Sequence, residues 1–158
     1  MQARIDHLMG IKGKKSVESI HKELGHIMWE YVGMGRTEEG LKTALKLLKD
    51  IRKEFETNLF IPGSTEGVNI ELEKALRLND FITMGELIAY DALNRNESCG
   101  GHFREEYQTE EGEAKRDDEN YFYVSCWEYQ GSDDVAPVLY KEPLVYEAIK
   151  VQTRNYKS

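Results

Sequence analysis

The chain has 158 residues, of which 40% are hydrophobic and 32% charged, an ordinary balance for one soluble domain or a compact module with an extension. Its 21 basic and 29 acidic residues give a net charge of −8, which argues against nucleic-acid and membrane-surface roles because an acidic surface repels phosphates and anionic lipids. No apolar run is long enough for a transmembrane helix, and the first residues lack a signal-peptide pattern, although a targeting signal of a longer protein would lie upstream.

The first two thirds of the chain have the patterns of amphipathic helices. A short helical segment around Ile5 and Met9 is expected to stop at Gly10. Ser16 is a suitable N-cap for a helix over about 16–33, which ends at the glycines that follow. The apolar stripe of this helix consists of Ile20, Leu24, Ile27, Met28, Tyr31 and Val32.

A second helix is predicted over about 37–56. Thr37 provides the N-cap, and Glu38 and Glu39 suit the positive end of the helix dipole. The pattern breaks at Pro62-Gly63. The stripe of this helix consists of Leu41, Ala44, Leu45, Leu48, Ile51 and Phe55.

The third predicted helix, over about 70–95, is the longest and would extend about 39 Å at 1.5 Å per residue. Gly85 lies on its apolar stripe, where glycine costs about 1 kcal/mol relative to alanine. A close crossing by another helix is the simplest compensation for that glycine. The stripe consists of Ala75, Leu78, Phe81, Ile82, Gly85, Ile88, Ala89, Ala92 and Leu93.

Three amphipathic helices with short connections can bury their stripes only against one another. The predicted fold is therefore mainly α, a spectrin-repeat-like three-helix bundle over residues 1–98. Residues 99–158 are expected to form a loop and an aromatic tail that lies on the bundle, on a neighbouring domain or on both, because the tail is too short to build its own core.

The tail contains short strand-like runs separated by turn residues. A turn is expected at residues 131–134, and the last two runs, on either side of Lys141-Glu142-Pro143, could form a small hairpin. The runs are Tyr121-Phe122-Tyr123-Val124, Trp127-Glu128-Tyr129, Val138-Leu139-Tyr140 and Leu144-Val145-Tyr146.

The loop after the third helix joins adjacent glycines to Cys99, His102 and Arg104. One interpretation is a Cys–His nucleophile pair, but Cys99 is expected at the negative end of a helix, which disfavours a thiolate. The favoured interpretation is that His102 and Arg104 pin the loop to carboxylates or backbone carbonyls. Residues 116–120 lack the ligand spacing of a calcium loop, so an ion-pair cluster is favoured there over a cation site.

A metal site and a disulfide framework are both disfavoured. The two cysteines, Cys99 and Cys126, are 27 positions apart and are better interpreted as reduced thiols. The four histidines are scattered, and His21 and His26 are five apart, which does not stack them on one helix face. No phosphate-binding loop, dinucleotide fingerprint or nucleophile elbow is present.

Two motifs carry a resemblance to a known family. Residues 95–104 (RNESCGGHFR) and 116–120 (RDDEN) closely resemble an R-x-E-S-R-G-x-H-x-R element and an acidic R-D-D-E-N element in the C-terminal domains of succinate dehydrogenase and fumarate reductase flavoprotein subunits. The first bundle helices of the family are also matched, by Met28, Val32-Gly33, Arg36 and Leu41, and its final residues resemble Thr153-Arg154-Asn155-Tyr156. Cys99 departs from the family, since most relatives have arginine at that place.

The resemblance implies an oxidoreductase of the tricarboxylic acid cycle and electron transport in which this region is not catalytic. FAD, the flavin-bearing histidine and the succinate or fumarate site would belong to upstream domains of the full-length subunit. The implied partners are the flavin-binding domain of the same polypeptide and an iron–sulfur subunit, in a cytoplasmic complex peripheral to the inner membrane. His102, Arg104, Asp117 and Asp118 are the candidate domain-docking residues, and no catalytic, cofactor or metal residues are assigned within the chain.

Two alternatives stay open. L-aspartate oxidase and related flavoproteins share this architecture, so their C-terminal domain is the nearest alternative. A free-standing helical interaction module with no enzyme attached is the alternative from another class. The upstream sequence separates them, because an enzyme subunit would carry a G-x-G-x-x-G fingerprint and a flavin-attachment histidine there.

Overall fold

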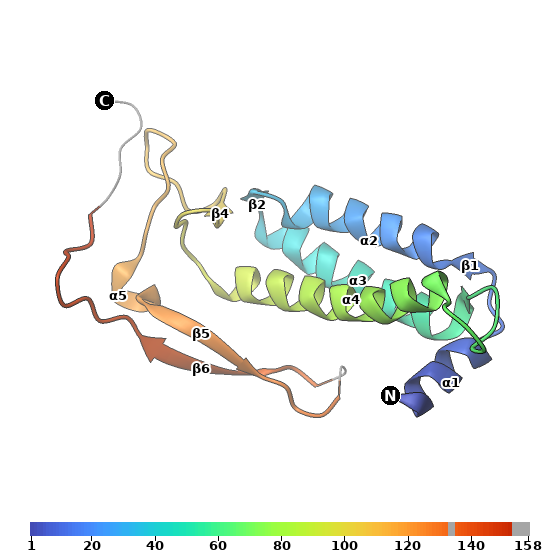
Figure 1. The fold of residues 1–158 in the computed structure, drawn as a ribbon. Coiled ribbons are helices and arrows are strands. Elements are labelled where there is room, and N and C mark those ends of the chain that lie inside the picture. The colour runs from blue at the N-terminus through green and yellow to red at the C-terminus, as the bar shows by residue number, and fades with distance from the viewer. Residues whose placement is uncertain (133–134, 153–158) are drawn as a thin grey trace. The chain divides into compact units, whose positions relative to one another are not determined.

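The structure is a computed structural model that describes residues 1–132 and 135–152, and the chain divides into two compact units, Met1–Asn94 and Arg95 onward (Figure 1). The expected mainly α fold with short strands is confirmed. None of the helices among the described residues combines the length and the apolar character that crossing a bilayer requires.

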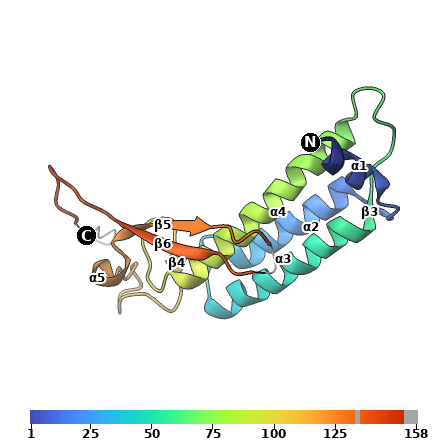
Figure 2. The same cartoon turned by 90° about the horizontal axis from the view of Figure 1, so that it is seen from below.

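The first unit is a bundle of three long helices, which run side by side in both Figure 1 and Figure 2. Short strands and a short N-terminal helix surround them. In chain order its elements are α1 (Gln2–Gly10), β1 (Lys15–Ser16), α2 (Val17–Val32), β2 (Gly35–Arg36), α3 (Glu38–Asn58), β3 (Leu59–Phe60) and α4 (Ile70–Asn94).

Side-chain caps set the N-terminal ends of the three long helices. The Ser19 backbone N–H donates to Ser16 Oγ at 3.2 Å, and the Gly40 N–H donates to Thr37 Oγ1 at 3.0 Å, as the sequence predicts. α4 has an N-cap that was not predicted: the Leu72 N–H donates to Asn69 Oδ1 at 3.1 Å.

The apolar stripes of α2, α3 and α4 meet in one core. Most of the predicted stripe residues are buried, and the partly buried Met28, Tyr31, Leu45 and Leu93 pack against them. Phe81 and Ile88 of the predicted α4 stripe are exposed instead, because each precedes a fully buried residue, Ile82 or Ala89, and is rotated about 100° from it around the helix axis. The large buried apolar residues of the three helices include Ile20, Leu24, Ile27, Leu41, Leu48, Ile51, Phe55, Leu72, Leu78 and Ile82.

Gly85 marks the close crossing of the helices that its position predicts. A Cβ built on Gly85 would lie 3.1 Å from Met28 Sδ, 3.6 Å from Leu24 Cδ1 and 3.7 Å from Leu48 Cδ2. Side chains from α2 and α3 therefore fill the space in front of this backbone, and the lost helix propensity is offset by closer packing.

One charged contact joins α3 to α4 within the bundle. The guanidinium of the buried Arg52 donates from Nε to Glu86 Oε1 at 3.2 Å and from Nη2 to Thr83 Oγ1 at 3.1 Å. A second bond from Nη2 to Glu86 makes the pair bidentate. Such pairing supplies the charge compensation that a buried guanidinium requires.

Two short parallel strands pair at the end of the bundle where α2 begins and α3 ends. Lys15 pairs with Leu59 and Ser16 with Phe60, so β1 and β3 lie beside each other. Gly13 approaches the end of α3 so closely that an added Cβ would lie 1.9 Å from the Asn58 carbonyl carbon. Only glycine fits there without movement of the backbone.

The second unit is built from loops, a one-turn helix and a hairpin. Its named elements are β4 (Phe103–Arg104), α5 (Asp118–Tyr121), β5 (Tyr123–Glu128) and β6 (Val138–Pro143). β5 and β6 are antiparallel, with Tyr123 opposite Pro143 and Glu128 opposite Val138. The predicted turn at 131–134 lies between them, although Asp133 and Asp134, like Thr153-Arg154-Asn155-Tyr156, fall outside the described residues.

The hairpin differs from the prediction in which strands pair. Lys141-Glu142-Pro143 belongs to β6 rather than to a turn, and residues 144–146 are not a strand. The register explains this, because Pro143 ends the strand, where its missing N–H does no harm. Tyr121 is likewise in α5 rather than in a strand, since Asp117 caps that turn by accepting from the Asn120 N–H.

We predict that Gly85→Leu lowers the free energy of unfolding of the chain by about 1–3 kcal/mol, because the added side chain overpacks the crossing. The same substitution at Gly25 is the matched control. Nothing lies within 4 Å of a Cβ at Gly25, so Gly25→Leu is expected to raise stability by up to about 1 kcal/mol through helix propensity. Urea unfolding followed by circular dichroism measures both, and equal effects at the two glycines would contradict the close crossing.

Candidate docking site

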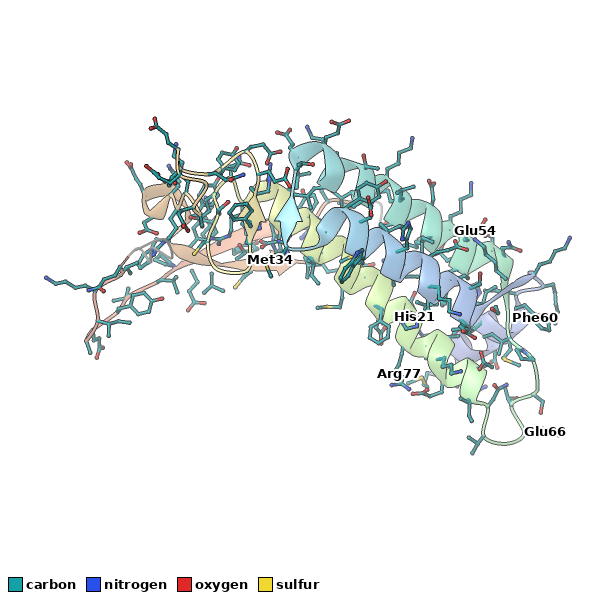
Figure 3. The ribbon with its side chains drawn as sticks, turned by 90° about the horizontal axis from the view of Figure 1, so that it is seen from above. His21, Met34, Glu54, Phe60, Glu66 and Arg77 are labelled. Carbon is teal, nitrogen blue, oxygen red and sulfur yellow. The ribbon has the colours of Figure 1, made fainter. Side chains whose placement is uncertain are left out.

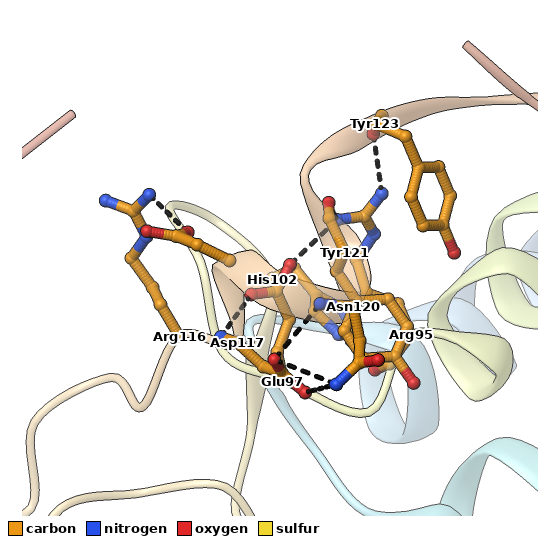
Figure 4. Close-up of polar contacts among 9 residues, drawn as sticks. Arg95, Glu97, His102, Arg116, Asp117, Asn120, Tyr121 and Tyr123 are labelled. Carbon is orange, nitrogen blue, oxygen red and sulfur yellow. Dashed lines mark hydrogen bonds and ion pairs between the residues drawn. The ribbon is translucent and has the colours of Figure 1, made fainter. Parts of the chain in front are cut away.

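Arg95, the first residue of the second unit, ties two distant segments of that unit together. Its Nη1 donates to Glu97 Oε1 at 2.7 Å and to the Tyr121 carbonyl at 3.0 Å, and its Nη2 donates to the Tyr123 carbonyl at 3.1 Å (Figure 4). The guanidinium carbon also lies 5.6 Å and 5.1 Å from the centroids of the Tyr121 and Tyr123 rings. This one cation therefore holds the start of the unit against the start of the hairpin.

Glu97 extends this connection to the acidic motif. Its side chain is only 3% exposed, and its second oxygen, Oε2, accepts the backbone N–H of Asp117 at 2.9 Å. A carboxylate removed from water needs such partners, since burial penalises an unpaired charge. The Arg95 guanidinium and the Asp117 amide provide them, so the motif at 95–104 and the motif at 116–120 are joined through one buried side chain.

Ser98 organises the turn that carries the candidate residues. Its buried hydroxyl accepts the Arg104 backbone N–H at 2.8 Å and donates to the Arg104 carbonyl at 3.1 Å. Between these residues the Cys99 N–H donates to the His102 carbonyl and the His102 N–H donates to the Cys99 carbonyl, at 2.8 Å and 3.1 Å. Gly100 has φ +59, a left-handed conformation that favours glycine.

His102 and Arg104 are held within this turn by different partners. His102 is half-buried, and its Nε2 lies 2.9 Å from the Arg95 carbonyl, so Nε2 carries the proton and donates. Arg104 is fully buried, donates from Nε to Glu106 Oε2 at 3.1 Å and lies over the Tyr107 ring at 5.4 Å. Both side chains thus hold the loop through a carbonyl or a carboxylate, the favoured interpretation of the sequence.

The two candidate aspartates have separate surroundings. Asp117 is half-buried and accepts from the Asn120 side-chain amide at 2.9 Å, which closes the one-turn α5. Asp118 is exposed and accepts from Arg116 Nε at 3.0 Å. The hydrogen bond to Asp118 raises the pKa of Arg116, against a smaller lowering from burial. Residues 116–120 therefore form an ion pair and a cap.

The structure thus joins three of the four candidates, His102, Arg104 and Asp117, through Arg95, Glu97 and Ser98. These three connecting residues were not among the candidates. The sequence held a signal for them, because all three lie in the motif that carries the family resemblance, but a sequence does not show which side chains of a motif are buried and paired. Both cysteines are exposed free thiols, and the described residues contain no group of three or more His, Cys, Asp or Glu suited to a metal ion.

We predict that Glu97→Gln lowers the free energy of unfolding of the second unit by about 1–3 kcal/mol, because Arg95 loses a charged partner while it stays partly buried. Urea unfolding followed by Trp127 fluorescence, in a Trp29→Phe background, measures it. Glu105→Gln, at an exposed carboxylate of the same loop, is the control and should change nothing. Identical midpoints for both variants would show that the Glu97 pair is not stabilising.

Comparisons with known proteins identify the family of this chain. A family model described as the fumarate reductase flavoprotein C-terminus matches residues 21–156, which is most of the chain and includes parts of both units. The fumarate reductase flavoprotein subunit of Proteus vulgaris is 29% identical over 121 residues, which are 77% of this chain and 19% of that protein.

Two further matches are informative. L-aspartate oxidase 2-b of Nicotiana tabacum is 37% identical over 88 residues, which are 56% of this chain and 13% of that protein. A solved quinol–fumarate reductase with menaquinol molecules has the same fold over 94% of this chain and 25% of its own, with a TM-score of 0.79 at 23% identity. The chain therefore spans a quarter or less of the proteins it matches, and it belongs to the fumarate reductase flavoprotein C-terminal family.

Proposed function

We propose that this chain is the non-catalytic helical domain of a succinate dehydrogenase or fumarate reductase flavoprotein subunit, in which it supports the FAD-binding domain. The family match carries the proposal, because it covers the loop and hairpin as well as the bundle. Interconversion of succinate and fumarate, with electron transfer through an iron–sulfur subunit, belongs in this proposal to the complete subunit and its complex.

The contacts of the residues in the 95–104 motif support a structural role. Arg95, Glu97 and Ser98 are bonded to other groups of the same unit, which gives their buried charge and hydroxyl internal partners. Such a network holds a loop in one conformation, and a fixed loop can dock without a large ordering entropy. We therefore assign the motif to positioning of the loop rather than to chemistry.

The docking face of the loop is proposed to include His102, Arg104, Asp117 and Asp118. Asp118 is exposed and His102 and Asp117 are half-buried, so these three offer polar groups at the surface. Arg104 is buried and would act by holding the shape of the loop. Whether residues 99–158 rest on the flavin domain, on the bundle or on both stays a prediction, as does a peripheral position on the cytoplasmic face of the inner membrane.

The second candidate function is the C-terminal domain of an L-aspartate oxidase. The 37% identity to the tobacco enzyme favours it, although over fewer residues than the fumarate reductase match. The sequence upstream in the gene and an assay of the complete subunit separate the two. Reduction of the flavin by succinate supports the main proposal, whereas reduction by L-aspartate alone supports the alternative.

The purified 158-residue chain is expected to bind no FAD and to interconvert neither succinate nor fumarate, because the proposal places the flavin and the substrate site in other domains. Absorbance near the flavin bands after incubation with FAD, followed by gel filtration, tests binding. A preparation that stays yellow, or one that oxidises succinate, would contradict the division of labour proposed here.

In the complete subunit, Arg104→Ala is expected to accelerate loss of flavin by about tenfold, about 1.4 kcal/mol, through weaker domain docking. Turnover per bound flavin should stay unchanged, because no catalytic group is removed. Lys115→Ala, an exposed cation of the same loop, is the control and should retain flavin normally. Normal assembly and flavin content in the Arg104→Ala subunit would count against the docking role of this loop.

A further inference from the structure

α4 has apolar side chains on two different sides. One side, with Leu78, Ile82 and Ala89, is buried in the bundle. The other carries Phe81, Met84 and Ile88, which are 46%, 53% and 42% exposed. Their spacing of three and four residues places them in one strip along the helix. A helix that is apolar on two sides is normally covered on both, and here only one is covered.

Residues of α2 extend this exposed strip from α4 onto the neighbouring helix. The His21 ring stacks on the Phe81 ring with centroids 5.6 Å apart, and Figure 3 shows His21 between α2 and α4. Trp29 is 83% exposed, and a Cβ on Gly25 would meet nothing within 4 Å. We call this surface the α2–α4 apolar face, consisting of His21, Gly25, Trp29, Phe81, Met84 and Ile88.

The outer side of α3 has the opposite character. It carries four exposed lysines at helical spacing, Lys42, Lys46, Lys49 and Lys53. Burial of such ammonium groups is costly, whereas burial of tryptophan, phenylalanine and methionine side chains is favourable because it removes apolar surface from water. The bundle thus has one side suited to solvent and one side suited to contact with another protein surface.

We propose that the α2–α4 apolar face docks against an apolar surface of the flavin-binding domain of the same polypeptide. The inference rests on the proposed function. The chain spans 19% of the Proteus flavoprotein subunit, so a complete subunit has several times more protein available to cover this face.

The covalent connection favours that occupant over a separate protein. A domain of the same polypeptide would meet this face at the high effective concentration that a covalent tether provides, which a separate protein lacks.

Hydroxyl-radical footprinting with peptide mass spectrometry tests the proposal on unmodified side chains. Oxidation rates of Trp29, Phe81 and Met84 are compared between the 158-residue chain and the complete subunit. We expect these rates to fall by about tenfold in the complete subunit. Phe60, on β3 and 49% exposed, is the matched control for Phe81 and should react equally in both. Equal rates at Phe81, or equal protection of Phe60, would overturn the assignment.

A variant tests whether the face stabilises the contact between domains, as opposed to being merely covered in the complete subunit. Trp29→Asp should leave the thermal midpoint of the 158-residue chain unchanged, because Trp29 is exposed, yet accelerate proteolysis between the domains of the complete subunit by about tenfold. Lys46→Asp, on the lysine side of α3, is the control and should change neither. Unchanged proteolysis of the Trp29→Asp subunit contradicts the proposal.

Two further readouts keep the alternatives apart. Sedimentation of the 158-residue chain should show a monomer, and a dimer that Trp29→Asp dissociates would replace the flavin domain with a second copy as the occupant. Flavin content and succinate oxidation of the unmodified complete subunit test the proposed function separately. Protection of Trp29 in a subunit without flavin would retain the docking face and reject the flavoprotein role.

Discussion

The close packing of three apolar helix stripes is the constraint on which the first unit depends. Each of α2, α3 and α4 carries a stripe of large aliphatic side chains that the other two helices cover. Full burial of one such side chain stabilises the fold by about 1.5–3 kcal/mol. Gly85 allows the approach, since Met28, Leu24 and Leu48 occupy the space that a side chain there would take. The one buried charge of the interface, Arg52, is accommodated because Glu86 and Thr83 receive its donors. For the stability of this core, the way in which the stripes cross thus matters more than the length or composition of the helices.

The second unit is stabilised by a different kind of interaction. Among its described residues, the buried side chains are all polar: Glu97, Ser98 and Arg104. Arg95 and Glu97 connect three segments that are far apart in sequence, the turn at 98–104, the acidic motif and the start of β5. Polar networks of this kind depend on every partner being present, because a half-satisfied buried group is destabilising. Internal pairing of this kind accounts for the charged residues of the motif without a catalytic role.

Both units expose apolar or weakly supported surfaces of the kind that another protein surface usually covers. A two-stranded hairpin such as β5–β6 is marginal in water by itself, and the exposed Trp29, Phe81 and Met84 are unusual for a surface that stays in solvent. The chain spans 19% of the Proteus subunit and 25% of the solved quinol–fumarate reductase chain, which is compatible with the proposed docking. A fold by itself does not establish a function, so the functional assignment depends on the family motifs and on the proposed experiments.

The sequence alone determined the three helices, their caps at Ser16 and Thr37, the close approach at Gly85 and the family, because periodicity, capping residues and short motifs are local signals. Only the tertiary structure decided which strands pair in the tail and that Phe81 and Ile88 face outward. It also revealed Arg95, Glu97 and Ser98 as the residues that hold the loop. These features depend on contacts between segments distant in sequence, and short strand-like runs carry no information about their partners. Register and buried polar pairing emerge only when the chain has folded.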